Sequence, residues 1–354
     1  MRIGIVNDLA MAREALRRAV VSVPGHEIAW LAVDGADAVA KARIDRPDLI
    51  LMDLIMPVVD GVEATRRIMA ESPCAIVVVT SSVRAHLGRV YEAMGLGALD
   101  AVDTPELGPS GDVSGARLML DKIATVAKLL GRSPRVTSAS DDPPSTPTPP
   151  PPGGSPSWPL IAIGCSTGGP AALAQILSAL PESKDASVVI VQHVDSAFAP
   201  GLAEWLGERA RRPVELIQPG DRPLPGKIML AATNDHVILD EDRSLRYVAE
   251  PTTYHYRPSV DVFYQSLVRH WPEPGAAVLL TGMGRDGAIG LLALRRAGWL
   301  TIAQDEASSV VWGMPRAAVE ISAAELVLPL SAIAASLLER VRDRSHRLPG
   351  DSRR

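Results

Sequence analysis

Three apolar runs of the chain each lead into a residue that could take part in acyl transfer. Ser166 lies in IGCSTGG, His193 closes SVVIVQH, and Asp286 lies in LLTGMGRDGAIG. A serine nucleophile needs a base to take its proton, and the base needs an acid to hold its tautomer. These residue types at the ends of three apolar runs therefore predict nucleophilic catalysis on an ester or amide.

The segment around Ser166 matches a known turn between a strand and a helix. Residues 164–168 read Gly-Cys-Ser-Thr-Gly, which fits G-x-S-x-G, and the helix is expected to begin near Pro170. Small residues allow the sharp turn, and the helix N-terminus favours negative charge that develops at the serine. Two alternatives stay open on this pattern alone: a phosphate-binding turn, or a serine that only caps the helix.

Four histidines of the C-terminal half are candidates for the base. His193 follows an apolar strand, as Ser166 does, so both are expected at the carboxyl edge of one parallel sheet. The other candidates occupy a turn, a segment between tyrosines and a helix end; they are His236, His255 and His270. The shared strand-end position favours His193, and Asp286 follows a third buried strand at the same edge.

The loop that contains Asp286 also permits a different interpretation. Gly282, Gly284 and Gly287 have the G-x-G-x-x-G spacing of a dinucleotide-binding loop, and Asp305 follows about twenty residues later. This motif normally opens the first βαβ unit of its domain, whereas here it comes late. Asp286 would also place an anion where a pyrophosphate has to approach. The spacing therefore favours catalysis over nucleotide binding.

The chain has room for two domains, and a proline-rich segment separates them. Residues 133–159 hold ten of the 30 prolines in a chain of 354 residues, which is typical of an extended linker. We predict a domain over residues 1–132, the linker over 133–159, a second domain over 160–345 and a tail over 346–354.

Composition excludes several classes of protein. A net charge of −5 gives no electrostatic reason for nucleic-acid binding, and no apolar run reaches the roughly 18 residues of a membrane span. The N-terminus lacks the pattern of a signal peptide, and two cysteines form no disulfide framework. A cytoplasmic protein is expected.

Alternating apolar runs and helical patterns in residues 1–132 predict five parallel strands with helices on both faces. The predicted strand ends carry Asp8, Asp53 and Thr80. Two converging carboxylates suit Mg²⁺, and a carboxylate beside Mg²⁺ with a nearby hydroxyl could accept a phosphoryl group. The alternative is that Asp8 and Asp53 only cap the helices that follow them.

MDLIMPVVDGVEATRRI decides between these two interpretations, because it resembles the phosphorylation segment of a response-regulator receiver domain. The resemblance spans nearly the whole N-terminal half and implies a flavodoxin-like (βα)5 fold. It makes Asp53 the phosphoacceptor and Thr80 the switch hydroxyl, and it gives Asp8 and Asp53 to Mg²⁺.

This half departs from the receiver pattern at three positions. Asn7 replaces the first of two adjacent acids, Thr104 replaces the lysine before a proline, and Ala101 replaces the aromatic switch residue. With one acid and one lysine fewer around the phosphoacceptor, we expect slow or weakly Mg²⁺-dependent phosphorylation and altered switching.

The C-terminal half resembles the CheB-type protein-glutamate methylesterases. IGCSTGGPAAL, VIVQH, YRPSVDVFYQSL, LLTGMGRDGAIGLLALRRAG and QDEASSVVWGMPRAAVE match that family's signature segments in order. The resemblance implies a doubly wound, mostly parallel α/β domain with Ser166 as nucleophile, His193 as base and Asp286 as orienting acid. It also makes the Met283 backbone N–H an oxyanion donor. VND, TP and EATRRIMAESPCAIVVVT are most similar to the methylesterase of Wsp-type surface-sensing systems.

The family resemblance implies demethylation of glutamate methyl esters on cytoplasmic helices of methyl-accepting chemoreceptors, with possible deamidation of glutamine. It implies a CheA-type histidine kinase as phosphodonor, negative feedback on a chemosensory pathway, contact with the membrane only through receptors, and no cofactor for catalysis. A receiver joined to an oxidoreductase, a receiver with a DNA-binding output domain and an inactive adaptor are the alternatives. The late position of the glycine motif argues against the first, and the size of the second half and its lack of a basic recognition helix argue against the second. The complete Ser-His-Asp set argues against the third.

Overall fold

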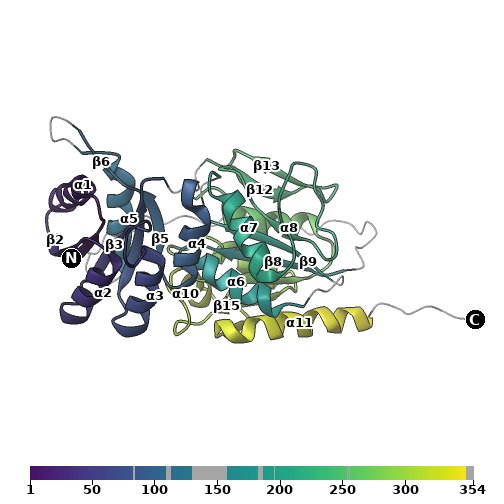
Figure 1. Ribbon diagram of the computed structural model, residues 1–354. Coiled ribbons are helices and arrows are strands. Elements are labelled where there is room, and N and C mark those ends of the chain that lie inside the picture. The colour runs from purple at the N-terminus through teal and green to yellow at the C-terminus, as the bar shows by residue number, and fades with distance from the viewer. Residues whose placement is uncertain are drawn as a thin grey trace, which may run out of the picture. The chain divides into compact units, whose positions relative to one another are not determined.

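The computed structural model divides the chain into two compact units, Met1–Ser140 and Asp141–Arg354 (Figure 1). It describes residues 1–82, 84–108, 113–129, 158–181, 186–194, 196–252, 254 and 256–347. Most of the predicted linker, most of the predicted tail and His255 lie outside these ranges. The domain boundaries drawn from the sequence therefore stay predictions.

The N-terminal unit is built on a five-stranded parallel sheet in the order β2-β1-β3-β4-β5. Its strands consist largely of β-branched and other apolar residues, so both faces can be covered by helices. The sheet confirms the predicted doubly wound fold of this half. The strands are β1 (Arg2–Val6), β2 (Glu27–Ala32), β3 (Leu49–Met52), β4 (Ala75–Thr80) and β5 (Asp100–Asp103).

Amphipathic helices cover this sheet and bury their apolar sides against it. One core cluster joins Leu16 and Val20 to the strand residues Ile3, Leu51 and Val79. The helices are α1 (Ala10–Val21), α2 (Gly35–Ile44), α3 (Gly61–Glu71), α4 (Leu87–Gly95) and α5 (Ala116–Leu129), with a short η1 (Arg84–His86) and a hairpin of β6 (Glu106–Leu107) and β7 (Val113–Ser114).

The loop after β3 is shaped by a close backbone approach. A side chain at Gly61 would collide with the carbonyl oxygen of Asp53, so only glycine fits there. Asp60 caps α3, because its carboxylate accepts from Glu63 N at 2.9 Å. These two residues hold the loop that follows Asp53 against the start of α3.

The C-terminal unit contains a seven-stranded parallel sheet in the order β10-β11-β9-β8-β14-β15-β16. It confirms the second predicted doubly wound domain. Its strands are β8 (Leu160–Cys165), β9 (Ser187–Gln192), β10 (Val214–Leu216), β11 (Ile228–Leu230), β14 (Ala276–Leu279), β15 (Leu300–Gln304) and β16 (Leu326–Leu328). An antiparallel hairpin, β12 (His236–Leu239) and β13 (Leu245–Val248), lies outside this sheet.

Helices lie on both faces of this sheet (Figure 1). A large core joins the sheet to α8, α9, α10 and the hairpin. The remaining helices, α6, α7 and α11, pack together. Within the described residues, none of the helices combines the length and apolar character needed to cross a bilayer. The helices are α6 (Gly169–Ala179), α7 (Ala199–Ala210), α8 (Val260–His270), α9 (Ala288–Arg296), α10 (Met314–Glu320) and α11 (Leu330–Arg347).

The crowding at Gly61 gives a testable prediction. Gly61→Ala forces the Asp53 loop away from α3 and should lower the free energy of unfolding of the N-terminal unit by about 2 kcal/mol, measured by urea denaturation. Gly88→Ala is the matched control, because a methyl group there meets no atom within 4 Å. Equal stability of the two variants would contradict the proposed constraint.

Candidate active site

Three neighbouring strands at the centre of the seven-stranded sheet bring the predicted catalytic residues together. Ser166 follows β8, His193 follows β9, and Asp286 lies in the loop between β14 and α9. His193 N donates to Cys165 O at 3.0 Å, and Ser166 N donates to Thr281 O at 3.0 Å. The segments that carry the three side chains are therefore linked at one carboxyl edge, as the sequence predicted.

Ser166 lies in a tight turn that needs its glycines. Gly168 has φ +79° and a side chain there would meet Val310 at 2.6 Å, while a side chain at Gly169 would collide with Gln192. Gly168, not Ser166, is the N-cap of α6, so the capping alternative for Ser166 is wrong. The Ser166 side chain is left free for chemistry at the start of the helix.

His193 and Asp286 form a short hydrogen bond, with Nε2 and Oδ2 2.7 Å apart. Because an ionised carboxylate only accepts, Nε2 carries the proton and Nδ1 keeps its lone pair. Nδ1 is buried and has no partner among the described residues. Nδ1 is therefore the ring nitrogen that remains to act as a base, whereas in the serine proteases the carboxylate holds Nδ1 and Nε2 is the base.

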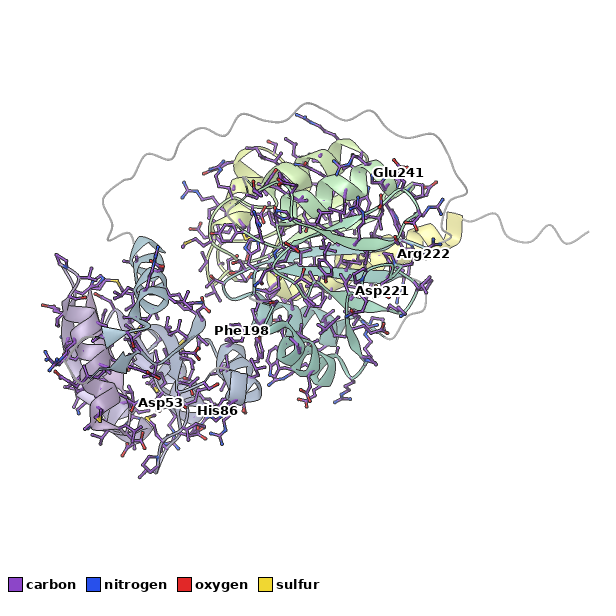
Figure 2. The ribbon with its side chains drawn as sticks, turned by 90° about the horizontal axis from the view of Figure 1, so that it is seen from above. Asp53, His86, Phe198, Asp221, Arg222 and Glu241 are labelled. Atoms are coloured by element: carbon purple, nitrogen blue, oxygen red, sulfur yellow. The ribbon has the colours of Figure 1, made fainter. Side chains whose placement is uncertain are left out.

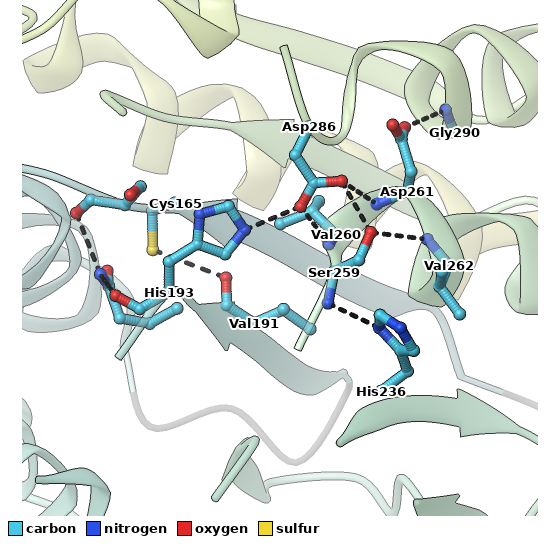
Figure 3. Close-up of polar contacts among 12 residues, drawn as sticks. Cys165, Val191, His193, His236, Ser259, Val260, Asp261, Val262, Asp286 and Gly290 are labelled. Atoms are coloured by element: carbon cyan, nitrogen blue, oxygen red, sulfur yellow. Dashed lines mark hydrogen bonds and ion pairs between the residues drawn. The ribbon is translucent and has the colours of Figure 1, made fainter. Parts of the chain in front are cut away.

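Asp286 occupies the N-terminus of a helix that belongs to a different segment (Figure 3). Its Oδ2 also accepts from Val260 N at 2.7 Å, and its Oδ1 accepts from Ser259 Oγ at 2.7 Å and from Asp261 N at 3.1 Å. These donors form the first turn of α8, whose partial positive charge favours an anion. The helix therefore fixes both oxygens of the carboxylate that orients His193.

The donors around Asp286 decide its ionisation. Burial would raise the pKa of this carboxyl, but the hydrogen bonds from His193, Ser259 and Val260 outweigh burial and lower it. Only 8% of Asp286 is exposed, so the anion persists in a site that excludes most water. A permanently charged acceptor is what an orienting acid needs.

Two further residues support this arrangement and were missed by the sequence interpretation. Tyr256 stacks on the His193 ring, with ring centroids 4.3 Å apart and planes 5° apart. Gln192 Nε2 donates to Ser166 O at 3.0 Å and to His193 O at 3.1 Å, which ties the two loops together. Both lie close in sequence to other residues of the site: Gln192 directly precedes His193, and Tyr256 lies three residues before Ser259, the N-cap of α8.

The other candidate bases are not available for that role among the described residues. His236 is fully buried; its Nδ1 accepts from Ser259 N at 3.1 Å, so its Nε2 donates to Pro251 O at 3.1 Å. His270 is the last residue of α8, at the opposite end from Asp286. His236 instead helps to position Ser259.

The loop of Met283 passes directly beside the serine. A side chain at Gly282 would meet Ser166 Cβ at 2.8 Å, and Gly282 O accepts from Gly313 N at 3.1 Å and Met314 N at 2.9 Å. The backbone hydrogen bonds within the described chain leave the Met283 amide without an acceptor. Its N–H is therefore available as a donor near the nucleophile.

The contacts of the glycine-rich loop argue against dinucleotide binding. The N-terminus of α9, where a pyrophosphate would bind, is filled by the carboxylate of Asp261, which accepts from Gly290 N at 2.6 Å. Asp305 caps its own loop, accepting from Ser308 N at 3.0 Å. Neither feature of the nucleotide motif is open to a ligand.

In the N-terminal unit, Asp53 lies at the carboxyl edge of the sheet with Asn7 and Thr80. Asn7 Nδ2 donates to Asp53 Oδ2 at 2.7 Å, and the Thr80 hydroxyl is buried without a partner among the described residues. Burial raises the pKa of Asp53 to about 6, although hydrogen bonds from the backbone of Ile55 and Leu54 lower it; repulsion from Asp8 raises it by a smaller amount. Leu9 and Asp60 are the N-caps of α1 and α3, so the interpretation of Asp8 and Asp53 as helix caps is wrong.

The donor set around Asp53 fits a small oxygen-binding cation, although it is sparse. Asp8 and Asp53 provide carboxylates, and a cation between them would offset the unfavourable burial of Asp53. Among the described residues, no three His, Cys, Asp or Glu side chains gather into a metal site. His86 lies in the same unit as Asp53 (Figure 2), and its effect on the pKa of Asp53 is the smallest of the five causes.

The contacts of Asp286 lead to a prediction for the serine. In Asp286→Asn an amide NH₂ must face either His193 or the first turn of α8, so Nδ1 no longer accepts the serine proton. We expect the rate of labelling of Ser166 by a fluorophosphonate to fall by about 10³-fold or more. Asp305→Asn is the control: Asp305 is a partly exposed aspartate that accepts from Ser308 N in its own loop, and the variant should keep the original rate. Equal rates in the two variants would contradict the role of Asp286.

Comparison with known proteins assigns a family to each of the two units. The response regulator receiver domain family matches residues 3–106, and the CheB methylesterase family matches residues 161–337. A protein-glutamate methylesterase/protein-glutamine glutaminase 3 of Pseudomonas aeruginosa is 52% identical over 339 residues, 96% of this chain and 99% of that protein. A second relative with this name, numbered 2, from Burkholderia orbicola is 53% identical over 340 residues, 95% of this chain and 98% of that protein. The crystal structure of the Thermotoga maritima CheB methylesterase catalytic domain is 31% identical, with a TM-score of 0.50, and covers 51% of this chain and 98% of that one. The chain therefore belongs to the CheB methylesterase family, with a receiver domain ahead of the hydrolase domain.

Proposed function

We propose that this hydrolase removes methyl groups from glutamate methyl esters on the cytoplasmic helices of chemoreceptors. The hydrogen bond between His193 and Asp286, at the same sheet edge as Ser166, carries the proposal. The names of the relatives specify both a methylesterase and a glutaminase. Both reactions pass through the same acyl intermediate.

The proposed reaction uses Ser166 as nucleophile and His193 as base. The serine oxygen attacks the γ-carbonyl of the ester while Nδ1 of His193 takes its proton. The tetrahedral intermediate then expels methanol, which receives that proton, and leaves a glutamyl-serine ester. Water, activated by the same histidine, hydrolyses this ester to free glutamate and serine. A glutamine substrate would release ammonia in place of methanol.

Two groups would stabilise the oxyanion. The Met283 N–H lies on the loop beside Ser166, and the serine immediately precedes the N-terminus of α6. Donors aimed at the developing charge contribute roughly 3–4 kcal/mol each in comparable hydrolases. Asp286 remains an anion throughout, because its hydrogen bonds hold its pKa low.

The receiver would make this activity responsive to a CheA-type histidine kinase. Asp53 would accept the phosphoryl group, Asp8 and Asp53 would hold Mg²⁺, and Thr80 would bind the phosphoryl oxygens. The ion would neutralise charge on the transferred group. Such a cytoplasmic enzyme would lower receptor methylation after kinase activation and so provide negative feedback. A Wsp-type surface-sensing pathway is the proposed setting, on the sequence segments named above.

The nucleophile is tested by Ser166→Ala. Methylated receptor incubated with the wild type should lose methyl groups, detected by mass spectrometry as a mass decrease at the modified glutamates. Ser166→Ala should slow this loss by about 10⁵-fold or more, and Ser178→Ala, an exposed serine on α6, should leave it unchanged. Demethylation by Ser166→Ala at the original rate would refute the proposed mechanism.

The amide contact to Asp53 gives a separate prediction for the receiver. Asn7→Asp adds a carboxylate ligand, so the Mg²⁺ concentration for half-maximal phosphorylation by acetyl phosphate should fall by about tenfold, since ligand charge tunes cation affinity. Asn7→Ala removes the amide without adding charge and should not give this gain. Phosphorylation is followed by mass spectrometry, and methanol release is measured in parallel. An unchanged Mg²⁺ requirement in Asn7→Asp would contradict the assigned site.

A further inference from the structure

Two buried aspartates each accept hydrogen bonds from the N-terminus of the neighbouring helix, one at α8 and the other at α9. Asp286, which precedes α9, accepts from the first turn of α8, and Asp261, in the first turn of α8, accepts from Gly290 N of α9 at 2.6 Å (Figure 3). Asp261 is only 4% exposed. The first turn of each helix therefore donates to a carboxyl group from the other segment.

These contacts require the two helices to pack closely. A side chain at Gly290 would meet Tyr264 Cβ at 2.7 Å and Asp261 O at 3.0 Å. At Gly287, where φ is +88°, a side chain would meet Val260 at 2.7 Å. The two glycines let the helix ends approach until each carboxylate reaches the other helix, which explains why the loop is rich in glycine.

We propose that Asp261 is a positioning residue for the hydrolytic reaction: by bridging α8 and α9, it holds Asp286 in the orientation that accepts from His193. This inference rests on the proposed catalytic roles of Ser166, His193 and Asp286. In its protonated form Asp261 also donates to the Asp286 carboxyl. Asp261 then holds Asp286 through its backbone N–H and through its side chain.

The charges of this pair are unusual. Within the described chain, no lysine or arginine forms a salt bridge with either carboxyl group. Burial, and then repulsion from Asp286, raises the pKa of Asp261 to about 7, while the pKa of Asp286 is lowered. Two interacting acids with pKa values pushed apart can keep one ionised and the other protonated. Asp261 is thus the member of the pair that gains or loses a proton near neutral pH.

The buried tyrosines and the buried thiol nearby stay neutral near pH 7. Burial raises the pKa of Tyr256, Tyr264 and Cys165, and burial lowers the pKa of His236. His193 contacts Asp286 directly, and Arg257 and Asp235 act on His236. A change in the pH profile caused by substitution of Asp261 can therefore be assigned to its own charge.

The test uses the full chain and a peptide that carries a glutamate γ-methyl ester, with methanol release measured from pH 5 to pH 9. Asp261→Asn can still accept from Gly290 N and donate to Asp286, but it cannot ionise. We expect kcat within roughly threefold of the wild type. The kcat/KM of the variant should equal that of the wild type near pH 6 and fall about threefold below it near pH 8, because only the wild type gains a negative charge at position 261 near pH 7.

Asp261→Ala leaves the Gly290 N–H without its acceptor and lets Asp286 turn. We expect kcat to fall by about 10²-fold with KM nearly unchanged, since a small misplacement of a catalytic group has this effect. Asp261→Asn should restore most of that loss. Ser266→Ala is the matched control: it removes a buried side chain of α8 that accepts from Leu239 N at 2.9 Å, away from Asp286. It should lower stability but leave kcat and the pH profile unchanged.

The outcomes separate this inference from the proposed function. A wild-type pH profile in Asp261→Asn, or a wild-type kcat in Asp261→Ala, overturns the positioning role. If Asp261→Ala does not fold, the profile of Asp261→Asn still decides. Ser166→Ala is measured in the same assay; if it stays active, the proposed site itself is wrong, whatever Asp261 does.

Discussion

The burial of one negative charge, the carboxylate of Asp286, is the constraint on which the candidate active site depends. A buried carboxylate without a cation is unfavourable unless hydrogen-bond donors replace water. Here the replacement comes from a histidine, a serine hydroxyl and two backbone amides of α8. Because those amides belong to a helix end, they cannot reorient, and the carboxylate is held by the fold rather than by one flexible partner. The orientation of His193 follows from that of Asp286.

The other loops at this edge of the sheet pack close to the Asp286 loop. β8 lies between β9 and β14, so the serine turn has the histidine on one side and the aspartate loop on the other. Glycines at 168, 169 and 282 bring the three loops closer than any side chain would allow. Gln192 then joins the carbonyl groups of Ser166 and His193. The geometry is set by backbone packing at the centre of the sheet, where strands are most constrained.

Sequence patterns predicted the parts of the structure that depend on periodicity and strand ends. Apolar runs gave the two parallel sheets, and their carboxyl ends gave Ser166, His193 and Asp286 as neighbours. The support of Asp286 could not be predicted in this way, because Ser259 and Asp261 become its partners only when α8 packs against α9. Ser259 carries a local signal as the N-cap of α8, but an N-cap serine normally binds its own helix, and here it also donates to Asp286. Here the carboxylate binds Nε2 of the histidine, whereas in the serine proteases it binds Nδ1. This difference depends on the orientation of the ring, which no sequence pattern indicates.

Asp53 and Asp286, two aspartates with proposed roles, show how the surroundings give the same side chain opposite pKa shifts. Asp53 and Asp286 both follow strands of parallel sheets and are 7% and 8% exposed. Asp286 meets the first turn of a helix and a histidine, and its pKa is lowered; Asp53 meets an amide, two backbone donors and a nearby acid, and burial raises its pKa to about 6. A carboxylate whose charge is already neutralised by donors is suited to orient a base for many turnovers. A carboxylate whose charge is poorly compensated is suited to gain a cation, because the cation relieves the cost of its burial. The difference in hydrogen-bond donors, not a difference in exposure, therefore accounts for the opposite pKa shifts of the two carboxyl groups.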